Sequence, residues 1–384
     1  MRVLMAAGAS TGGLYTYTDA LCCALNRAGA DVTVLTNSLW ADIQRPYRVE
    51  RLLFEFTDKK QQWSHLHWAA DRFWRSLRNS LRRNQFAVRK DFEVVHFQGV
   101  GTPLLDQIFL KSLARHLPVV LTVHDVKPHY ERFVSKASFI KRSLQIPHRL
   151  IIHYEAGKRQ LVDFWGVCAD RVDVIPHGIM PLQNPPGQKD ARKKINLPLN
   201  RQIILFFGGI RPNKGLDVLL KALEIVKSQN CRILLVIAGG LLGRFSFESY
   251  SDIIKKSGLS KHIQTFIKFI PEEDVDDFFA ASDLVVLPYL KFEAQSGVLL
   301  RAYAHRKPVV VSNVGAMGEL VSADNVGLVV EPGAKEPLAE AIMNVSGSLD
   351  KFQSQYSPEL ENKYSWEHIA ESTMRSYETA ISNK

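Results

Sequence analysis

The sequence lacks the features that mark secreted and membrane-spanning proteins. It has four cysteines in 384 residues, spaced neither as a disulfide framework nor as metal ligands, which predicts reduced thiols in a cytoplasmic protein. No window of about 20 residues is free of charge, so no transmembrane helix is expected. Met1 leads into a short apolar run and a glycine loop, without the apolar core or cleavage site of a signal peptide.

Acidic residues are in deficit. The chain has 49 Lys and Arg against 39 Asp and Glu, which gives a formal net charge of +10. Such a surplus is typical of proteins that bind nucleic acid, an anionic membrane or a phosphate-bearing substrate. The location of the cations along the sequence therefore indicates which partner to expect.

Short apolar segments alternate with helical patterns along the whole chain. Their near-continuous apolar character indicates strands buried on both faces, as in parallel sheets covered by helices. The alternation predicts an α/β protein with doubly wound, Rossmann-like sheets. The predicted strands cover residues 2–7, 31–36, 51–56, 93–97, 118–123, 149–153, 172–176, 202–207, 232–238, 264–269, 283–288, 308–312 and 327–330.

A proline-rich linker divides the chain near its middle. Residues 180–200 hold four prolines and show no apolar period. We therefore expect an N-terminal domain over 1–184, a second domain over 185–365, and a terminal helix over 366–384. Two such domains predict a cleft lined by the loops that follow the strands, where ligands of doubly wound sheets bind.

The first of these loops is rich in glycine. Gly8, Gly12 and Gly13 follow the first strand and precede a helix, which predicts an anion site at the helix N-terminus. The loop is not G-x-G-x-x-G, and no acid follows the second strand, so a nicotinamide dinucleotide is disfavoured. The alternative is a tight turn without a ligand.

Polar residues end two further strands of the N-terminal half. His124 and Asp125 follow the strand at 118–123, and His96 and Gln98 end the strand at 93–97. Side chains at these positions project toward a ligand, and His96 and Asp125 are candidates for the acceptor side. The alternative is ordinary histidines satisfied at strand ends.

Cations and a helix start combine in the second half. Gly208 and Gly209 end a strand, and Arg211 and Lys214 then precede an amphipathic helix. Two cations beside a helix N-terminus predict a phosphate clamp, whereas the alternative is a solvated turn with a basic rim.

A second helix start follows the strand at 283–288. Glu293 precedes Ser296 and Gly297, whose free amides at the first turn can hold a phosphate oxygen. Glu293 can accept hydrogen bonds from sugar hydroxyls, or it can simply complement the helix dipole.

Ten segments together resemble the retaining glycosyltransferases of group 1, or family 4, which have the GT-B fold. Covering essentially the whole chain, in the family's order, they are GGLYTYTDAL, VVHFQG, LTVHD, VIPHGI, FGGIRPNKGLDVLLKAL, VIAGG, SDLVVLPY, EAQSGVLLRAYAHRKPVVVSNVGAMGELV, GLVVEPG and YSWEHIA. The resemblance implies transfer of a sugar from a nucleotide diphosphate sugar, with retention and without a metal. The acceptor would be a glycan or a lipid-linked molecule in polysaccharide or glycolipid synthesis.

The resemblance also implies roles for single residues. Gly12 and Gly13 would approach the donor phosphates and the acceptor. His124 would touch the donor sugar, and Lys214 would hold the diphosphate. Glu293 matches the first acid of the family's E-x7-E motif and would bind sugar hydroxyls.

The amides of three consecutive residues would bind phosphate: Ser296, Gly297 and Val298.

The sequence departs from the family pattern at two positions that concern the donor. The second acid of the motif, which binds the ribose in relatives, is Arg301 here, so Arg301 would pair with phosphate or face solvent. Gly209 stands where the family has an arginine, and Arg211 would take its place. The helix from Trp366 would cross back onto the first domain.

No metal and no further cofactor are expected. The segment 271–279 contains Asp274-Val275-Asp276, a D-x-D pattern that binds metal in a different glycosyltransferase fold. Here it follows Pro271 at a helix start, where acids complement the helix dipole.

Much of the positive charge lies in residues 61–90, with seven Arg or Lys and one Asp. An apolar helical face is predicted from Trp63, Leu66, Ala70, Phe73, Trp74, Leu77 and Leu81. An amphipathic, basic, tryptophan-rich helix is typical of contact with anionic lipid, which would make the protein peripheral on a membrane. The alternative is a helix packed on its own domain. Nothing else supports nucleic acid.

Two other functions remain open. One is a GT-B sugar-nucleotide epimerase, and the other is a catalytically weak subunit that partners an active transferase. Nucleotide release that depends on an acceptor would separate a transferase from both.

Overall fold

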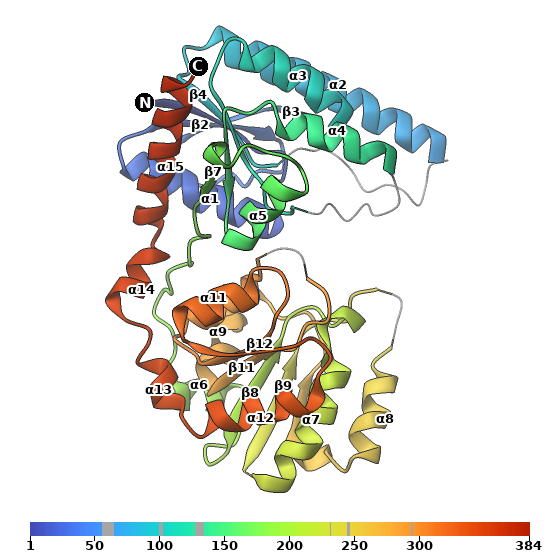
Figure 1. Ribbon diagram of the computed structural model, residues 1–384. Helices are drawn as coiled ribbons and strands as arrows, with labels where there is room; N and C mark the ends of the chain where they lie inside the picture. Colours follow the sequence, from blue (N-terminus) through green and yellow to red (C-terminus); the bar gives the residue numbers. More distant parts are fainter. Residues whose placement is uncertain (56–64, 100–102, 127–133, 231, 244–245, 293–294) are drawn as a thin grey trace. The chain divides into compact units, whose positions relative to one another are not determined.

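The computed structural model describes residues 1–384 except 56–64, 100–102, 127–133, 231, 244–245 and 293–294 (Figure 1). The chain folds into two compact units. Unit 1 comprises Met1–Gly178 and Asn362–Lys384, and unit 2 comprises Ile179–Glu361. The chain thus leaves unit 1 and returns to it through its last helix.

Unit 1 is built on a seven-stranded parallel sheet with the order β3-β2-β1-β4-β5-β6-β7. The strands are β1 (Arg2–Ala6), β2 (Asp31–Asn37), β3 (Arg48–Leu53), β4 (Val94–Phe97), β5 (Val119–Thr122), β6 (Arg149–Ile152) and β7 (Val172–Val174). Its helices are α1 (Gly12–Arg27), α2 (His65–Arg89), α3 (Pro103–Ala114), α4 (Val134–Leu144), α5 (Glu155–Asp163) and α15 (Trp366–Ser382). α3 packs beside α2 and α4, while α15 packs on α1 (Figure 1).

Unit 2 repeats this plan with six parallel strands in the order β10-β9-β8-β11-β12-β13. The strands are β8 (Gln202–Phe207), β9 (Ile233–Ala238), β10 (Ile263–Phe266), β11 (Leu284–Leu287), β12 (Val309–Ser312) and β13 (Gly327–Val330). Its helices are α6 (Gln188–Lys194), α7 (Leu216–Gln229), α8 (Glu248–Lys256), α9 (Glu272–Ala281), α10 (Gly297–Ala304), α11 (Met317–Asp324), α12 (Lys335–Ser346), α13 (Leu349–Gln353) and α14 (Pro358–Lys363).

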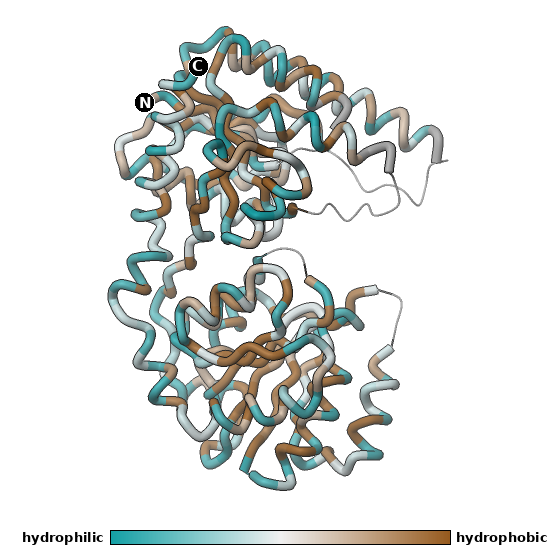
Figure 2. Tube along the Cα trace, viewed as in Figure 1, coloured by the Kyte–Doolittle hydropathy of each residue, from teal (hydrophilic) through white to brown (hydrophobic). Residues whose placement is uncertain are grey.

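The apolar runs form the centre of each sheet, coloured as hydrophobic in Figure 2. β4, β5, β9, β11 and β12 are buried along their full length, since helices cover both faces. The prediction of doubly wound parallel sheets is confirmed. The largest difference is at β3, because the predicted segment 51–56 is displaced from the observed strand Arg48–Leu53. β3 is a half-exposed edge strand, so backbone pairing with β2 decides its limits and the apolar run does not.

Helix α2 turns its apolar side outward. Phe73, Trp74 and Leu81 are 45%, 57% and 43% exposed, whereas the small residues Ser76 and Ser80 are buried. Packing of the apolar face on its own domain therefore does not hold for Phe73, Trp74 and Leu81, whereas Leu77 of the same face is half-buried. Two residues of the predicted apolar face lie outside the described side chains: Trp63 and Leu66. Within the described parts of the chain, no helix is both long and apolar enough to cross a membrane.

Candidate functional site

The strand order reverses once in each sheet. In unit 1 the reversal lies between β1 and β4, and in unit 2 between β8 and β11. Ligands of doubly wound sheets bind outside the carboxyl ends of the strands at such reversals. The loops predicted from the sequence follow these strands: residues 7–11 after β1, 98–99 after β4, 208–211 after β8, and 288–292 with 295–296 after β11. These four loops therefore lie at the reversal points of their own units, whereas His124 and Asp125 follow the neighbouring strand β5.

The loop after β1 leaves the start of α1 open. Gly12 has φ +75°, and a Cβ at Gly12 or Gly13 would meet no atom within 4 Å. The side-chain amide of Asn37 holds this loop in place. Its oxygen accepts a hydrogen bond from the Ser10 hydroxyl (2.7 Å), and its nitrogen donates one to the Gly8 carbonyl (3.3 Å). The side chain of the N-cap residue, Thr11, makes no capping hydrogen bond. The first amides of α1 are thus available to an anion. The sequence did not single out Asn37.

His124 follows β5 and belongs to a cluster of aromatic rings. The Tyr17 ring lies 5.0 Å from His124, 5.2 Å from His153 and 4.7 Å from His177, measured between centroids. Asp125 is exposed beside this cluster. The sequence pointed to His124 alone, because His153 and His177 follow other strands.

A chain of hydrogen bonds fixes the imidazole of His124. His153 Nδ1 lies 2.9 Å from the Ile175 carbonyl, His153 Nε2 lies 3.3 Å from His124 Nδ1, and His124 Nε2 lies 3.1 Å from Gln98 Oε1. A carbonyl only accepts, so His153 donates from Nδ1 and accepts at Nε2. His124 must then donate from Nδ1 and accept at Nε2. Gln98 places its amide oxygen, Oε1, at this nitrogen, so the network is completed only when the amide is turned to offer its NH2 group to His124.

The imidazoles of this cluster and that of His96 are neutral at physiological pH. Burial is the main cause and lowers the pKa of His96 and of His124 to about 3, and that of His177 to about 4. Burial also lowers the pKa of His153, with His124 and His177 adding to the effect. A neutral His124 has one proton, on Nδ1, and an unprotonated Nε2.

His96 lies inside unit 1 with no exposed surface. Its ring nitrogens contact the Tyr377 hydroxyl and the Thr122 hydroxyl, both at 2.7 Å. Tyr377 belongs to α15, so His96 joins the last helix to β4 and β5.

In unit 2 the turn before α7 is locked against the segment after β11. Gly215 has φ +68°, and a Cβ there would lie 1.9 Å from the Pro288 carbonyl oxygen. The Leu290 amide donates to the Asn213 carbonyl (2.9 Å), which holds the same two segments together. This contact places Lys214 beside the loop that leads to α10.

Replacing Gly215 with alanine is expected to destabilise unit 2 by about 2 kcal/mol or more, because the new Cβ adds a backbone clash to a strained positive φ. The free energy of unfolding from urea titration measures this effect. The matched control is Gly297→Ala, where a Cβ meets open space. Equal stability of the two variants would contradict the locked turn.

Aromatic rings hold the ammonium of Lys214. Its Nζ lies 3.4 Å from the centroid of Tyr289 and 4.4 Å from that of Phe292. Burial, with a contribution from the exposed Arg211, lowers the pKa of Lys214 to about 8. The ammonium is thus partly desolvated and oriented before a ligand arrives, which strengthens its pairing with an anion. The sequence missed Tyr289 and Phe292, since neither ring is polar.

The start of α10 lies beside this cation. Ser296 caps the helix and accepts from the Leu299 amide at 3.4 Å, while Gly297 faces open space. Val298 reaches across to Gly208, whose Cβ would lie 3.3 Å from it. Gln295 buries both polar atoms of its amide without a hydrogen-bond partner among the described residues. Gly209, on the same turn as Gly208, packs close to Leu242, and Glu293 lies outside the described residues.

Arg301 turns toward α9. It forms ion pairs with Glu272 (2.8 Å) and Asp276 (2.9 Å). Asp274 and Asp277 pair with Lys194 instead. The acids of the D-x-D pattern are therefore engaged in ion pairs that join α9 to α6 and α10, and the described residues contain no group of three His, Cys, Asp or Glu placed to hold a metal.

Two family models match consecutive parts of the chain. The model Glycosyltransferase Family 4 covers residues 11–181, and the model Glycosyl transferases group 1 covers residues 187–353. The chain belongs to the group 1 glycosyltransferase family. The boundary between the two matches falls in the proline-rich linker.

Curated relatives of this family member include D-inositol 3-phosphate glycosyltransferases. That of Rhodococcus opacus is 29% identical over 243 residues, which are 61% of this chain and 54% of the relative. An uncharacterized glycosyltransferase of Methanocaldococcus jannaschii is 28% identical over 233 residues, 58% of each chain. The chain thus spans about half the length of the curated relatives it matches.

Solved structures share the fold along the whole chain. A sucrose-phosphate synthase from Thermosynechococcus elongatus has a TM-score of 0.74 at 18% identity and covers 100% of both chains. The Anabaena protein HepE in complex with UDP has a TM-score of 0.72 at 19% identity, covering 98% of this chain and 99% of that one.

Proposed function

We propose that this protein transfers a sugar from a nucleotide diphosphate sugar to a glycan or lipid-linked acceptor, with retention at the anomeric carbon. The observation that carries this proposal is the pre-oriented ammonium of Lys214 beside Arg211 and the open first turn of α10. Cations and free helix amides together form a site for a diphosphate. The Gln295 amide, which has no hydrogen-bond partner among the residues that the structure describes, is a further group for the donor.

The reaction depends more on groups that stabilise the charges developing on the diphosphate and the sugar ring than on a protein nucleophile. As the bond from the anomeric carbon to the phosphate oxygen breaks, its electron pair stays on the diphosphate and the sugar ring becomes positive. Lys214, Arg211 and the α10 amides stabilise the anion without a metal. The acceptor oxygen then bonds to the same face of the sugar, and its proton passes to the departing phosphate.

His124 suits contact with the transferred sugar. A cationic imidazole would repel the developing positive charge on the ring, whereas neutral His124 does not. Its bond to His153 keeps the proton on Nδ1, while Nε2 lies against the Gln98 amide, so His124 offers the sugar a neutral ring that is fixed in place.

Uridine diphosphate sugars are the first donors to test. Structures of HepE contain UDP and UDP-glucose, which supports this class. Ribose recognition must differ from that implied by the E-x7-E motif, since Arg301 is engaged by Glu272 and Asp276.

For the acceptor side we propose contact with an anionic bilayer through α2. Phe73, Trp74 and Leu81 expose apolar surface on this basic helix, which is the pattern of helices that lie at a lipid interface. A lipid-linked acceptor would be reached from such a position.

The test measures nucleotide release from UDP-, GDP- and ADP-sugars with and without candidate acceptors, after a thermal-shift screen has identified the nucleotide. A ligand at a hundred times its dissociation constant stabilises the fold by about 2.7 kcal/mol. Release of one nucleotide only when acceptor is present is expected. Binding without any release would favour the partner subunit, and interconversion of the donor sugar would favour the epimerase.

A further inference from the structure

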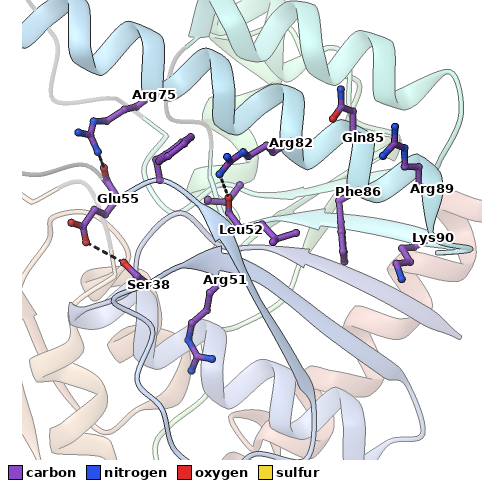
Figure 3. A pocket seen from close by; sticks show the side chains of 12 residues that line it. Ser38, Arg51, Leu52, Glu55, Arg75, Arg82, Gln85, Phe86, Arg89 and Lys90 are labelled. Atoms are coloured by element: carbon purple, nitrogen blue, oxygen red, sulfur yellow. Dashed lines mark hydrogen bonds between the residues drawn. The ribbon is translucent and has the colours of Figure 1, made fainter.

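Unit 1 contains a groove of about 820 Å³ between α2 and the edge strand β3 (Figure 3). The residues that line it are Ser38, Arg51, Leu52, Leu53, Phe54, Glu55, Arg75, Arg82, Gln85, Phe86, Arg89 and Lys90. None of them belongs to the histidine cluster or to the loop after β1. The groove is therefore separate from the unit 1 residues assigned to the donor.

The charge of the lining is one-sided. Five cations face a single acid, Glu55. Arg75 and Arg51 are paired with Asp71 and Asp42, which lie outside the lining. The side chains of Arg89 and Lys90, by contrast, make no hydrogen bond or ion pair with any residue that the structure describes. The unpaired positive charge thus concentrates at the end of the groove formed by the last turn of α2.

The middle of the groove holds a fixed guanidinium. Arg82 donates to the Leu52 carbonyl at 2.8 Å, as drawn in Figure 3, and lies 4.2 Å from the ring centroid of Phe54. Stacking on a ring and one backbone bond restrain this side chain while leaving donors free. An anion that bonds to Arg82 thus meets a group whose freedom is already reduced.

The arginines follow the helix in a regular row. Arg75, Arg82 and Arg89 are seven residues apart, so they share one face of α2 at intervals of about 10.5 Å. The residue before each of them is exposed and apolar: Trp74, Leu81 and Val88. A row of guanidinium groups thus runs beside a row of apolar side chains. This pairing matches a lipid interface, where phosphates adjoin hydrocarbon.

We propose that the groove is a binding site for the phosphate of an anionic phospholipid headgroup, with Arg82, Arg89 and Lys90 as its donors. The inference deepens the proposed bilayer contact of α2 and rests on it. It adds that the headgroup binds in a defined pocket through charge-assisted hydrogen bonds. If the attraction were diffuse, every cation of the helix would contribute equally to the membrane affinity. The headgroup would seat between α2 and β3 while Trp74 and Leu81 enter the interface.

The experiment measures partitioning of the full chain onto vesicles of pure phosphatidylcholine and of equal parts phosphatidylcholine and phosphatidylglycerol. Wild-type protein is expected to prefer the second. Arg89→Gln should weaken this binding by about tenfold or more, since a charge-assisted hydrogen bond is lost. Arg89→Lys should lose severalfold, because it keeps the charge without the planar donor pair.

Arg78→Gln is the matched control, because Arg78 is exposed on the same helix but does not line the groove. It should lose about fivefold, as expected for one charge near an anionic surface. Equal losses for Arg78→Gln and Arg89→Gln, with Arg89→Lys unchanged, would overturn the groove and leave the bilayer contact standing. Absence of wild-type binding would overturn both, while acceptor-dependent nucleotide release still tests the transferase separately.

Inorganic phosphate separates a headgroup from free anion. Sodium phosphate should displace the wild-type protein from the anionic vesicles no better than sodium chloride of equal ionic strength if the lipid as a whole is the ligand. Strong displacement by phosphate alone would show a site for the free anion and overturn the lipid assignment.

Discussion

Replacing Lys214 with alanine is expected to lower turnover by about 10²-fold or more. The ammonium is held against Tyr289 and Phe292, and its removal takes away a cation that stabilises the charge developing on the departing diphosphate. Such an interaction is strongest in the transition state, so kcat should fall more than the affinity for nucleoside diphosphate. Steady-state kinetics with the donor found by the thermal-shift screen measure both.

The control is Lys221→Ala, on the exposed face of α7, where Lys221 pairs with Asp217. It should leave both constants unchanged. A folded Lys214→Ala variant with near-normal turnover would remove the phosphate clamp from the proposal.

The same lysine predicts a pH dependence. The pKa of Lys214 is lowered to about 8, so the side chain loses its proton as the pH rises through that value. The cation that pairs with the diphosphate disappears above it, and binding of nucleoside diphosphate should weaken there. Titrations on both sides of pH 8 measure the change. Lys214→Arg stays charged throughout and should give a flat profile; a flat profile in the wild type would contradict the assignment.

Replacing His153 with alanine is expected to destabilise the fold by about 3–5 kcal/mol and to reduce turnover. The substitution opens a cavity and leaves two buried groups unpaired: the Ile175 carbonyl and Nδ1 of His124. With that restraint lost, His124 can place its proton on either nitrogen, and its ring is free to turn. Urea titration measures the stability, and the donor assay measures the turnover.

A spectroscopic readout separates positioning from simple structural damage. In wild-type protein labelled with nitrogen-15 histidine, His124 should show a protonated Nδ1 and an unprotonated Nε2 from about pH 5 to pH 8. In the His153→Ala variant this preference should vanish at temperatures where the protein is still folded. His116→Ala, an exposed histidine of unit 1, should change neither property. An unaltered His124 signal in His153→Ala would refute the positioning role.

Much of the architecture could be predicted from the sequence, because buried parallel strands leave apolar runs that are easily read. The runs at 202–207 and 327–330 coincide with β8 and β13. The edge strand β3 could not be placed in the same way, since half of it faces solvent. The amphipathic pattern of α2 predicted a helix but not which side faces outward, because that depends on the small residues Ser76 and Ser80 packing inward.

The candidate site was only partly predictable for a related reason. Loops after strands point to Lys214 and His124, since glycines and polar residues interrupt apolar runs there. The groups that tune them come from distant segments. Tyr289 reaches Lys214 from the loop after β11, and His153 reaches His124 from the end of β6. Such contacts depend on the order of the strands in the sheet, and the local sequence of neither segment indicates that order.

The return of α15 to unit 1 has a consequence for synthesis on the ribosome. Trp366 packs on Gly178 and on Tyr17, and Tyr377 bonds to His96, so both aromatic residues complete the interior of unit 1. All of unit 2 lies between these parts in the chain. At about 5–20 residues per second, the nascent first sheet therefore waits roughly 10–40 s for its last helix. During that interval its apolar surface beside α1 stays uncovered and is open to chaperones or to aggregation.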